Sequence, residues 1–160
     1  MRSVEREWTP EREREPTGPS RVLVPFDGSE YARAALEYAL ELFPSAEFTA
    51  LTIVDDSSVP YLPNPFDGAG TGSGSRVDRA ERTSPEREGV LEVAADHDAE
   101  VATTSRIGSP SRGVLDYLDE SDVDHVVIGS RGRSGVSRIV HGSVAEVVVR
   151  HSPVPMTVVP

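Results

Sequence analysis

Residues 21–44 read RVLVPFDGSEYARAALEYALELFP, and the class of fold can be worked out from this stretch. Its first part, Val22 to Phe26, is apolar without the alternation of a half-exposed strand, which predicts a β-strand covered on both faces. Ser29 is a helix-capping residue type, and apolar residues then recur with helical spacing until Pro44 ends the pattern. The stretch therefore predicts a strand, a short loop and a helix.

The same unit recurs along the rest of the chain. The Ser-Pro pairs at 84–85 and 109–110 have the form of a helix cap followed by a first helical residue. The further predicted strands are residues 47–54, about 100–106, 125–128 and 155–159, and the further predicted helices are residues 84–97, one from 109 onward and 143–151. Because parallel strands need crossovers, this alternation predicts a single-domain α/β fold: a doubly wound, five-stranded parallel sheet with helices on both faces, Rossmann-like in arrangement.

Helical spacing also predicts which side chains enter the core. In the helix that follows Ser84, the expected inward residues are Val90, Leu91, Val93 and Ala94. In the last helix, the expected inward residues are Val144, Val147 and Val148.

Two segments do not fit the alternation of strands and helices. Residues 1–20 alternate Glu with Arg and contain three prolines, which predicts a flexible N-terminal tail. Residues 57–83 are rich in Pro and Gly and include GAGTGSGS at 68–75. No strand leads into these glycines and the GxGxxG spacing is missing, so we interpret residues 57–83 as a mobile linker inside a domain that spans 21–160.

Composition narrows the class of protein. The chain has 160 residues and no Cys, which excludes a disulfide framework and a thiolate metal site. No apolar run approaches the roughly 20 residues of a membrane span, and the N-terminus lacks the apolar centre of a secretory signal. We therefore expect a cytoplasmic protein without a membrane partner.

The charge is strongly acidic. The formal net charge is -11, and all 16 basic residues are Arg. A salt-filled cytoplasm accounts for this composition, since high ionic strength screens a dense acidic surface. A GC-rich genome that favours Arg codons is the alternative. In either case the acidity argues against binding bulk nucleic acid, which needs a broad basic face.

Two loops at the predicted carboxyl ends of strands carry the candidate chemistry, because ligands of such sheets bind there. Asp27 follows the first strand, and GSRGRSGVSRIVHGS at 129–143 follows the fourth. In the second loop, glycines allow backbone amides to approach an anion, and a helix N-terminus offers unpaired N–H groups. Residues 129–150 also hold four Arg against one Glu, although chance clustering of surface Arg would give the same count.

These residues resemble the nucleotide-binding branch of the universal stress protein family. The family signature Gly-x2-Gly-x9-Gly-Ser is met by Gly129, Gly132, Gly142 and Ser143, and the segments PFDGSE and PVPMTVV also match. The resemblance covers residues 21–160 and implies an adenine nucleotide alpha hydrolase-like sheet. It also implies binding of ATP, with Mg²⁺ or Mn²⁺ on the phosphates in some members, and a homodimer formed through the last strand.

The resemblance assigns roles by position. It implies that the Asp27 carboxylate, flanked by Pro25 and Phe26, bonds the ribose hydroxyls and that Ile53 meets the adenine through its backbone. It also implies that the ribose side is lined by Ile128 and Gly129. The phosphates would be held by Gly132, Gly142, Ser143 and Val144. ATP, AMP and a cyclic nucleotide share these groups, so the sequence does not choose among them.

Three functions remain open at this stage. A binding module that responds to ATP is favoured, since there is no Walker lysine, no Asp pair by the glycine loop and no arrangement typical of nucleophilic catalysis. His141, beside Gly142, is interpreted as a surface residue. The alternatives are a slow ATPase or nucleotidyl-transfer enzyme in the same pocket, and a nucleotide-free structural dimer whose glycines serve only turns.

Overall fold

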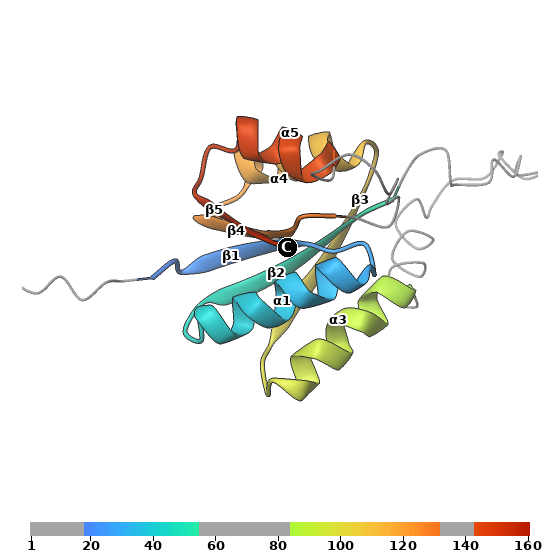
Figure 1. The fold of residues 1–160 in the computed structure, drawn as a ribbon, viewed down its shortest axis with the longest axis vertical. Helices are drawn as coiled ribbons and strands as arrows, with labels where there is room; N and C mark the ends of the chain where they lie inside the picture. Colours follow the sequence, from blue (N-terminus) through green and yellow to red (C-terminus); the bar gives the residue numbers. More distant parts are fainter. Residues whose placement is uncertain (1–17, 55–83, 132–142) are drawn as a thin grey trace, which may run out of the picture.

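A computed structural model describes residues 18–54, 84–131 and 143–160, with the side chain of Ser143 excepted. The elements within these ranges alternate as the sequence predicts (Figure 1). They are β1 (Arg21–Pro25), α1 (Glu30–Leu42), β2 (Glu47–Val54), α3 (Pro85–Asp96), β3 (Val101–Ile107), α4 (Pro110–Glu120), β4 (His125–Gly129), α5 (Ser143–His151) and β5 (Met156–Val159).

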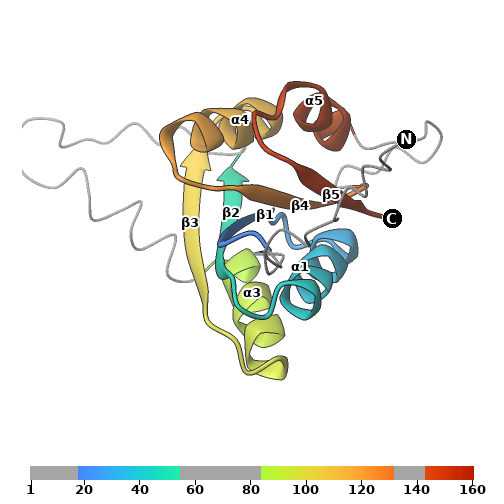
Figure 2. The same cartoon turned by 90° about the vertical axis from the view of Figure 1, so that its left-hand side faces the viewer.

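The five strands form one parallel sheet in the order β3-β2-β1-β4-β5. Helices α1 and α3 cover one face of the sheet, and α4 and α5 cover the other (Figures 1 and 2). The predicted fold class is therefore confirmed. Strand β1 lies at the centre of the sheet, so its two faces both need apolar cover.

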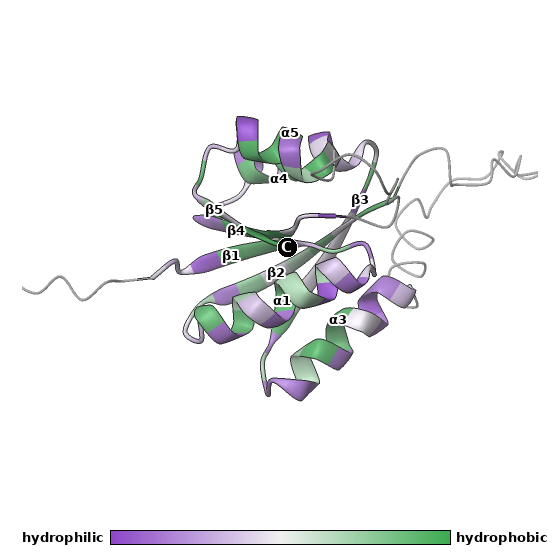
Figure 3. Cartoon of the chain, in the orientation of Figure 1, coloured by the Kyte–Doolittle hydropathy of each residue, from purple (hydrophilic) through white to green (hydrophobic). Residues whose placement is uncertain are grey.

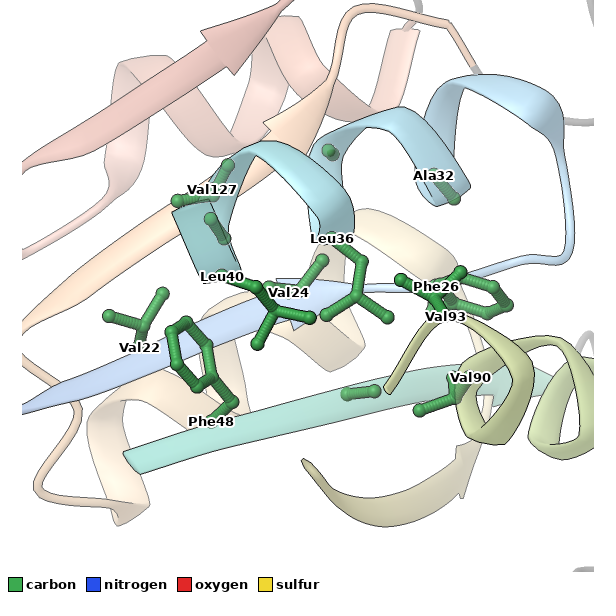
Figure 4. Packing of buried hydrophobic residues seen from close by; sticks show 13 residues of the cluster. Val22, Val24, Phe26, Ala32, Leu36, Leu40, Phe48, Val90, Val93 and Val127 are labelled. Carbon is green, nitrogen blue, oxygen red and sulfur yellow. The ribbon is translucent and has the colours of Figure 1, made fainter. Parts of the chain in front are cut away.

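Successive residues of the central strands serve two cores. In β1, Val22 and Val24 point toward α1 and α3, whereas Leu23 between them points toward α4 and α5. Figure 3 shows the apolar residues gathered along the strands and on the inward sides of the helices. Figure 4 shows the first core from close by, with Leu36 and Leu40 of α1 beside Val24. Each such buried side chain contributes roughly 1.5–3 kcal/mol.

The predicted helix starts are found at all three Ser positions. Ser29 caps α1 by accepting the N–H of Ala32 on its Oγ at 3.1 Å. Ser84 caps α3 in the same way by accepting the N–H of Arg87 at 3.2 Å. Ser109 occupies the cap position of α4 but makes no such side-chain bond, so this helix relies on the Pro that follows it.

Two of the expected core residues are wrong. Leu91 is 49% exposed, because the buried stripe of α3 runs along Val90 and Val93 and position 91 lies about 100° around the helix from position 90. Val147 is 37% exposed for the same reason in α5, where Ala145 and Val148 face the sheet. The residue types at these positions, Leu and Val, do not by themselves distinguish an exposed position from its buried neighbours.

Hydrogen bonds at the amino ends of the strands hold the residues that lead into β1. The carboxylate of Asp124 accepts the N–H of Ser20 at 2.9 Å and that of Arg21 at 3.1 Å, and the carbonyl of Ser20 accepts the N–H of Glu47 at 2.8 Å. Ser20, placed in the predicted tail, is thus bonded to the domain. Residues 1–17 and the predicted linker 57–83 lie outside the described residues. Within the described part of the chain, no helix has both the length and the apolar character needed to cross a membrane.

The ring of His125 is half-buried between β5 and the end of α1. Its Nε2 lies 3.0 Å from Oγ1 of Thr157, and its ring meets that of Phe43 edge-on with the centroids 5.1 Å apart. Burial lowers the pKa of His125 from its usual value of 6.5, and the charge of Asp124 offsets part of this shift. The neutral imidazole is therefore the form that this packing favours.

Replacing His125 by Gln should remove a loss of stability on acidification. Because the pKa of His125 is lower in the folded protein, the unfolded chain binds more protons below about pH 6.5, so stability present above that pH is lost as the pH falls toward the folded pKa. We expect the melting temperature of the natural protein to fall more steeply than that of His125→Gln between about pH 7 and pH 5. Parallel pH profiles in thermal melts would contradict this expectation.

Candidate functional site

The strand order places a topological switch point at the carboxyl ends of β1 and β4, and we refer to this region as the β1–β4 crevice. These two strands are neighbours, with Val22 paired to His125 and Leu23 to Val126. From β1 the chain continues into α1 on one face, and from β4 it continues toward α5 on the other (Figure 1). In open parallel sheets this reversal opens the crevice in which ligands bind. The two loops that the sequence analysis singled out leave the sheet at this crevice.

The loop after β1 fixes the carboxylate of Asp27 at the start of α1. Oδ1 of Asp27 accepts the N–H of Ser29 at 2.9 Å, which holds the half-buried side chain in one orientation. Gly28 between them has φ +79°, a left-handed conformation that a side chain would strain. The same Ser29 caps α1, so the carboxylate and the positive end of the helix dipole lie together.

Pro25 and Phe26 connect the strand to this loop. Pro25 is half-buried and ends β1. The ring of Phe26 is 2% exposed and packs under α3, where Figure 4 shows it beside Val93 and where a Cβ on Gly89 would lie 3.3 Å from it. What Phe26 brings to the crevice is therefore its backbone rather than its ring.

The backbone of Ile53 faces the region beyond the carboxyl end of β1. The ladder between β1 and β2 ends where Phe26 donates its N–H to the carbonyl of Leu51 at 2.8 Å. Backbone groups point the same way at every second residue of a strand, so the N–H and C=O of Ile53 face the β1 side, beyond the last paired residue. Val54 points the other way, since its carbonyl accepts the N–H of Gly108 at 2.9 Å.

The side chain of Ile53 has a separate role in packing. It lies against α4, where a Cβ on Gly113 would come within 2.6 Å of Ile53 Cδ1. Gly113 therefore lets α4 approach the sheet closely. The side chain supports the core on this face, while the backbone is presented at the crevice.

Gly129 brings the end of β4 against the first turn of α1. A Cβ on Gly129 would lie 2.7 Å from the carbonyl oxygen of Tyr31, closer than side chains approach. Ile128, just before it, is buried in the core beneath α4 and α5. The sequence predicts that Gly129 lines a ligand site. The structure adds a packing role that the spacing of the glycines does not reveal.

Tyr31 and Arg131 were not among the predicted site residues, yet they lie at this crevice. The guanidinium carbon of Arg131 is 5.8 Å from the centroid of the Tyr31 ring, a cation–π distance. Ser130 between Gly129 and Arg131 donates its N–H to the carbonyl of Val159 at 2.7 Å, which ties this exit to β5. The sequence signal that could have found Tyr31 is its place in the first turn of α1, two residues after the capping Ser29.

The remaining predicted residues are only partly described. Gly132 and Gly142 lie outside the described residues. Ser143 is the first residue of α5, and Val144 after it is half-buried against the core of that face. In the part of the chain that the structure covers, no three His, Asp or Glu side chains are close enough together to hold a metal ion.

A second hollow lies at the opposite end of the sheet. It has a volume of about 630 Å³ and lies between the carboxyl ends of α1 and α3, lined among others by Pro44, Glu47, His97 and Asp98. It is remote from the β1–β4 crevice, since these residues stand at the amino ends of β2 and β3. The β1–β4 crevice, by contrast, combines a fixed carboxylate with a backbone donor and acceptor.

An open parallel sheet with helices on both faces defines a doubly wound α/β protein. The family model of the universal stress protein family matches residues 19–160. The chain therefore belongs to the universal stress protein family. A universal stress protein of Methanocaldococcus jannaschii is 26% identical over 141 residues, which cover 87% of this chain and 81% of that protein.

Solved structures agree on the fold. The universal stress protein UspA from Lactobacillus plantarum has a TM-score of 0.64 and 26% identity, with 88% of this chain and 97% of that one covered. A universal stress protein in complex with cAMP has a TM-score of 0.62 at 21% identity, with 89% and 97% covered. A family protein from Arabidopsis thaliana with AMP bound has a TM-score of 0.56 at 15% identity, with 88% and 90% covered.

Replacing Gly129 by Ala should destabilise the fold by about 1–3 kcal/mol, the usual range for overpacking. The new methyl group would meet the backbone of Tyr31, which cannot swing away as the end of a side chain could. Gly18→Ala is a matched control, since its Cβ would lie at an ordinary 3.8 Å from Phe43. Equal free energies of unfolding for the two variants in urea would show that this approach does not matter.

Proposed function

We propose that this universal stress protein binds an adenine nucleotide, ATP in the first place, in the β1–β4 crevice and acts as a regulatory module rather than as an enzyme. The observation that carries the proposal is the pairing of a fixed carboxylate, Asp27, with the outward-facing backbone of Ile53 at the same end of adjacent strands. Family membership and the AMP and cAMP found in structural neighbours support the same class of ligand.

The described residues fit a nucleoside. The N–H and C=O of Ile53 give one donor and one acceptor, which complement the acceptor N1 and the amino group of an adenine edge. The carboxylate of Asp27 is a suitable acceptor for ribose hydroxyls, because an ionised carboxylate offers about four acceptor positions. Pro25 and Gly129 then line the ribose side, and Phe26 and Ile128, whose side chains are buried in the core, contribute backbone only.

The phosphates would lie toward the start of α5. There Gly132, Gly142, Ser143 and Val144 form the proposed cradle, since the first turn of a nine-residue helix offers unpaired N–H groups. An accompanying Mg²⁺ or Mn²⁺ would be held mainly by phosphate oxygens, in keeping with the way these ions bind nucleotides. Such an ion would neutralise charge on the phosphates.

Nucleotide occupancy would act by population shift. A bound ligand biases a protein only if it binds one state better than another, and the crevice is shared by elements on both faces of the sheet. A slow ATPase or nucleotidyl transferase using the same crevice is the alternative. Turnover of radiolabelled ATP above that of Gly142→Val would favour this alternative.

Replacing Asp27 by Asn should weaken binding of ATP and of adenosine alike by about 1.5–3 kcal/mol, the cost of a hydrogen bond to a charged group. The amide oxygen of Asn can still accept the N–H of Ser29, so the loop should keep its shape while the charge is lost. Asp119→Asn on the exposed side of α4 is the control for charge. In calorimetry with both ligands, unchanged affinity in Asp27→Asn would contradict the ribose role.

We also propose that two copies pair through β5. This strand is at the edge of the sheet and Val158 is 40% exposed. Because the carbonyls of Pro155 and Val159 both accept N–H groups from the β4 side, the backbone of Val158 faces outward. Prolines at 153, 155 and 160 limit such pairing to a short edge.

Val158→Pro tests the pairing, because it removes an outward N–H without touching the ladder to β4. We expect the natural protein to sediment as a dimer and Val158→Pro as a folded monomer in analytical ultracentrifugation. Thr157→Pro is the control, since its N–H faces β4 and its loss should lower the melting temperature instead. A dimer that survives Val158→Pro would contradict pairing through this edge.

The acidic composition supports a salt-rich cytoplasm as the working environment. A net charge of -11 on 160 residues repels itself at low salt, and screening relieves this repulsion. A genome that favours Arg codons remains the alternative account of the Arg content.

A further inference from the structure

Among the described arginines, Arg131 and Arg87 are the two without an ion pair to a described carboxylate. Most described arginines are neutralised by a carboxylate, as Arg106 is by Glu120 at 2.7 Å and Arg150 by Glu146 at 2.8 Å. For Arg131 the recorded contact in the described residues is the face of the Tyr31 ring, with no described carboxylate in ion-pair distance. Its side chain is exposed, two residues beyond Gly129.

The position of this cation is fixed from two sides. Tyr31 belongs to the first turn of α1, and its carbonyl oxygen packs against Gly129 at the end of β4. The N–H of Ser130 is bonded to β5 at 2.7 Å, so the backbone that leads to Arg131 is held as well. The guanidinium therefore lies just beyond the carboxyl end of β4, over the ring of Tyr31 in the first turn of α1.

A guanidinium held by a ring face keeps donors available. Arg131 lies 5.8 Å from the centroid of the Tyr31 ring, in cation–π range, and its five N–H groups are more than one ring face can engage. These groups match the spacing of phosphate oxygens and bind them bidentately. An ion pair with a carboxylate would have used the same groups. Tyr31 thus orients the charge without neutralising it.

We infer that Arg131 is a specificity-determining residue that makes the crevice favour nucleotides with more phosphate groups, and that Tyr31 is its positioning residue. This inference rests on the proposed function, because it needs a nucleotide in the crevice. Attraction to Arg131 is absent for adenosine and grows with the negative charge of the ligand. The preferred ligand class is then a nucleoside polyphosphate rather than a nucleoside monophosphate or a cyclic nucleotide.

The test is calorimetry with ATP, AMP and adenosine on four variants. Arg131→Gln should lower ATP affinity about tenfold, the effect of losing one charge-assisted bond, lower AMP affinity less and leave adenosine affinity unchanged. Arg150→Gln removes the same charge from α5 and should leave all three affinities unchanged, since Arg150 is paired with Glu146. Tyr31→Leu should reduce the preference for ATP over adenosine, and Tyr31→Phe, which keeps the ring, should retain it.

The outcomes separate this inference from the proposed function. If the natural protein binds ATP but Arg131→Gln behaves as Arg150→Gln does, the role of Arg131 is overturned and the nucleotide site stands. Equal losses for ATP and adenosine in Arg131→Gln would also overturn it, since they would indicate a structural effect. If the natural protein binds none of the three ligands, the proposed function fails and the inference fails with it.

Discussion

The close approach of β4 to the first turn of α1 is the constraint on which this molecule depends. The carbonyl oxygen of Tyr31 lies where a side chain on Gly129 would have to stand, at 2.7 Å from such a Cβ. Because β4 and β1 are neighbours whose following helices lie on opposite faces, this contact lies at the carboxyl ends of both strands, where the proposed site is. It also places the ring of Tyr31 beneath Arg131, so one packing contact positions both a wall of the site and a cation at its mouth.

Much of the fold could be predicted from the sequence because its signals are local. The bounds of β2 and α5 agree with their predictions, since each follows a break such as Pro44 or Gly142 and carries an unbroken apolar pattern. Ser29 and Ser84 correctly predict the starts of the helices that they cap. Leu91 shows the limit of such signals, because an apolar residue one step beside the buried stripe looks the same in the sequence as one within it.

The sequence predicts where the candidate site residues lie along the strands, but it says less about what else each of them contacts. Asp27 follows β1 and Ile53 lies near the end of β2, and from these positions both are expected at the carboxyl end of the sheet, where the structure has them. Phe26 and Gly129 also take part in packing. The ring of Phe26 packs under α3, and the absence of a side chain on Gly129 makes room for the backbone of Tyr31. Both contacts are with helices that are distant in sequence. The stack of Arg131 on Tyr31 joins residues 100 positions apart, and no spacing rule within one segment could have found it.

The loops after β1 and β4 are proposed to form the two sides of one nucleotide site. The most direct measurement is to follow the backbone amide signals of the ¹⁵N-labelled protein by nuclear magnetic resonance while ATP is added. The account predicts that the signals of Asp27 to Ser29, Ile53, and Gly129 to Arg131 shift together at one apparent affinity. Shifts confined to the hollow at the other end of the sheet, around Glu47 and Asp98, or the absence of any shift at saturating ATP, would contradict it.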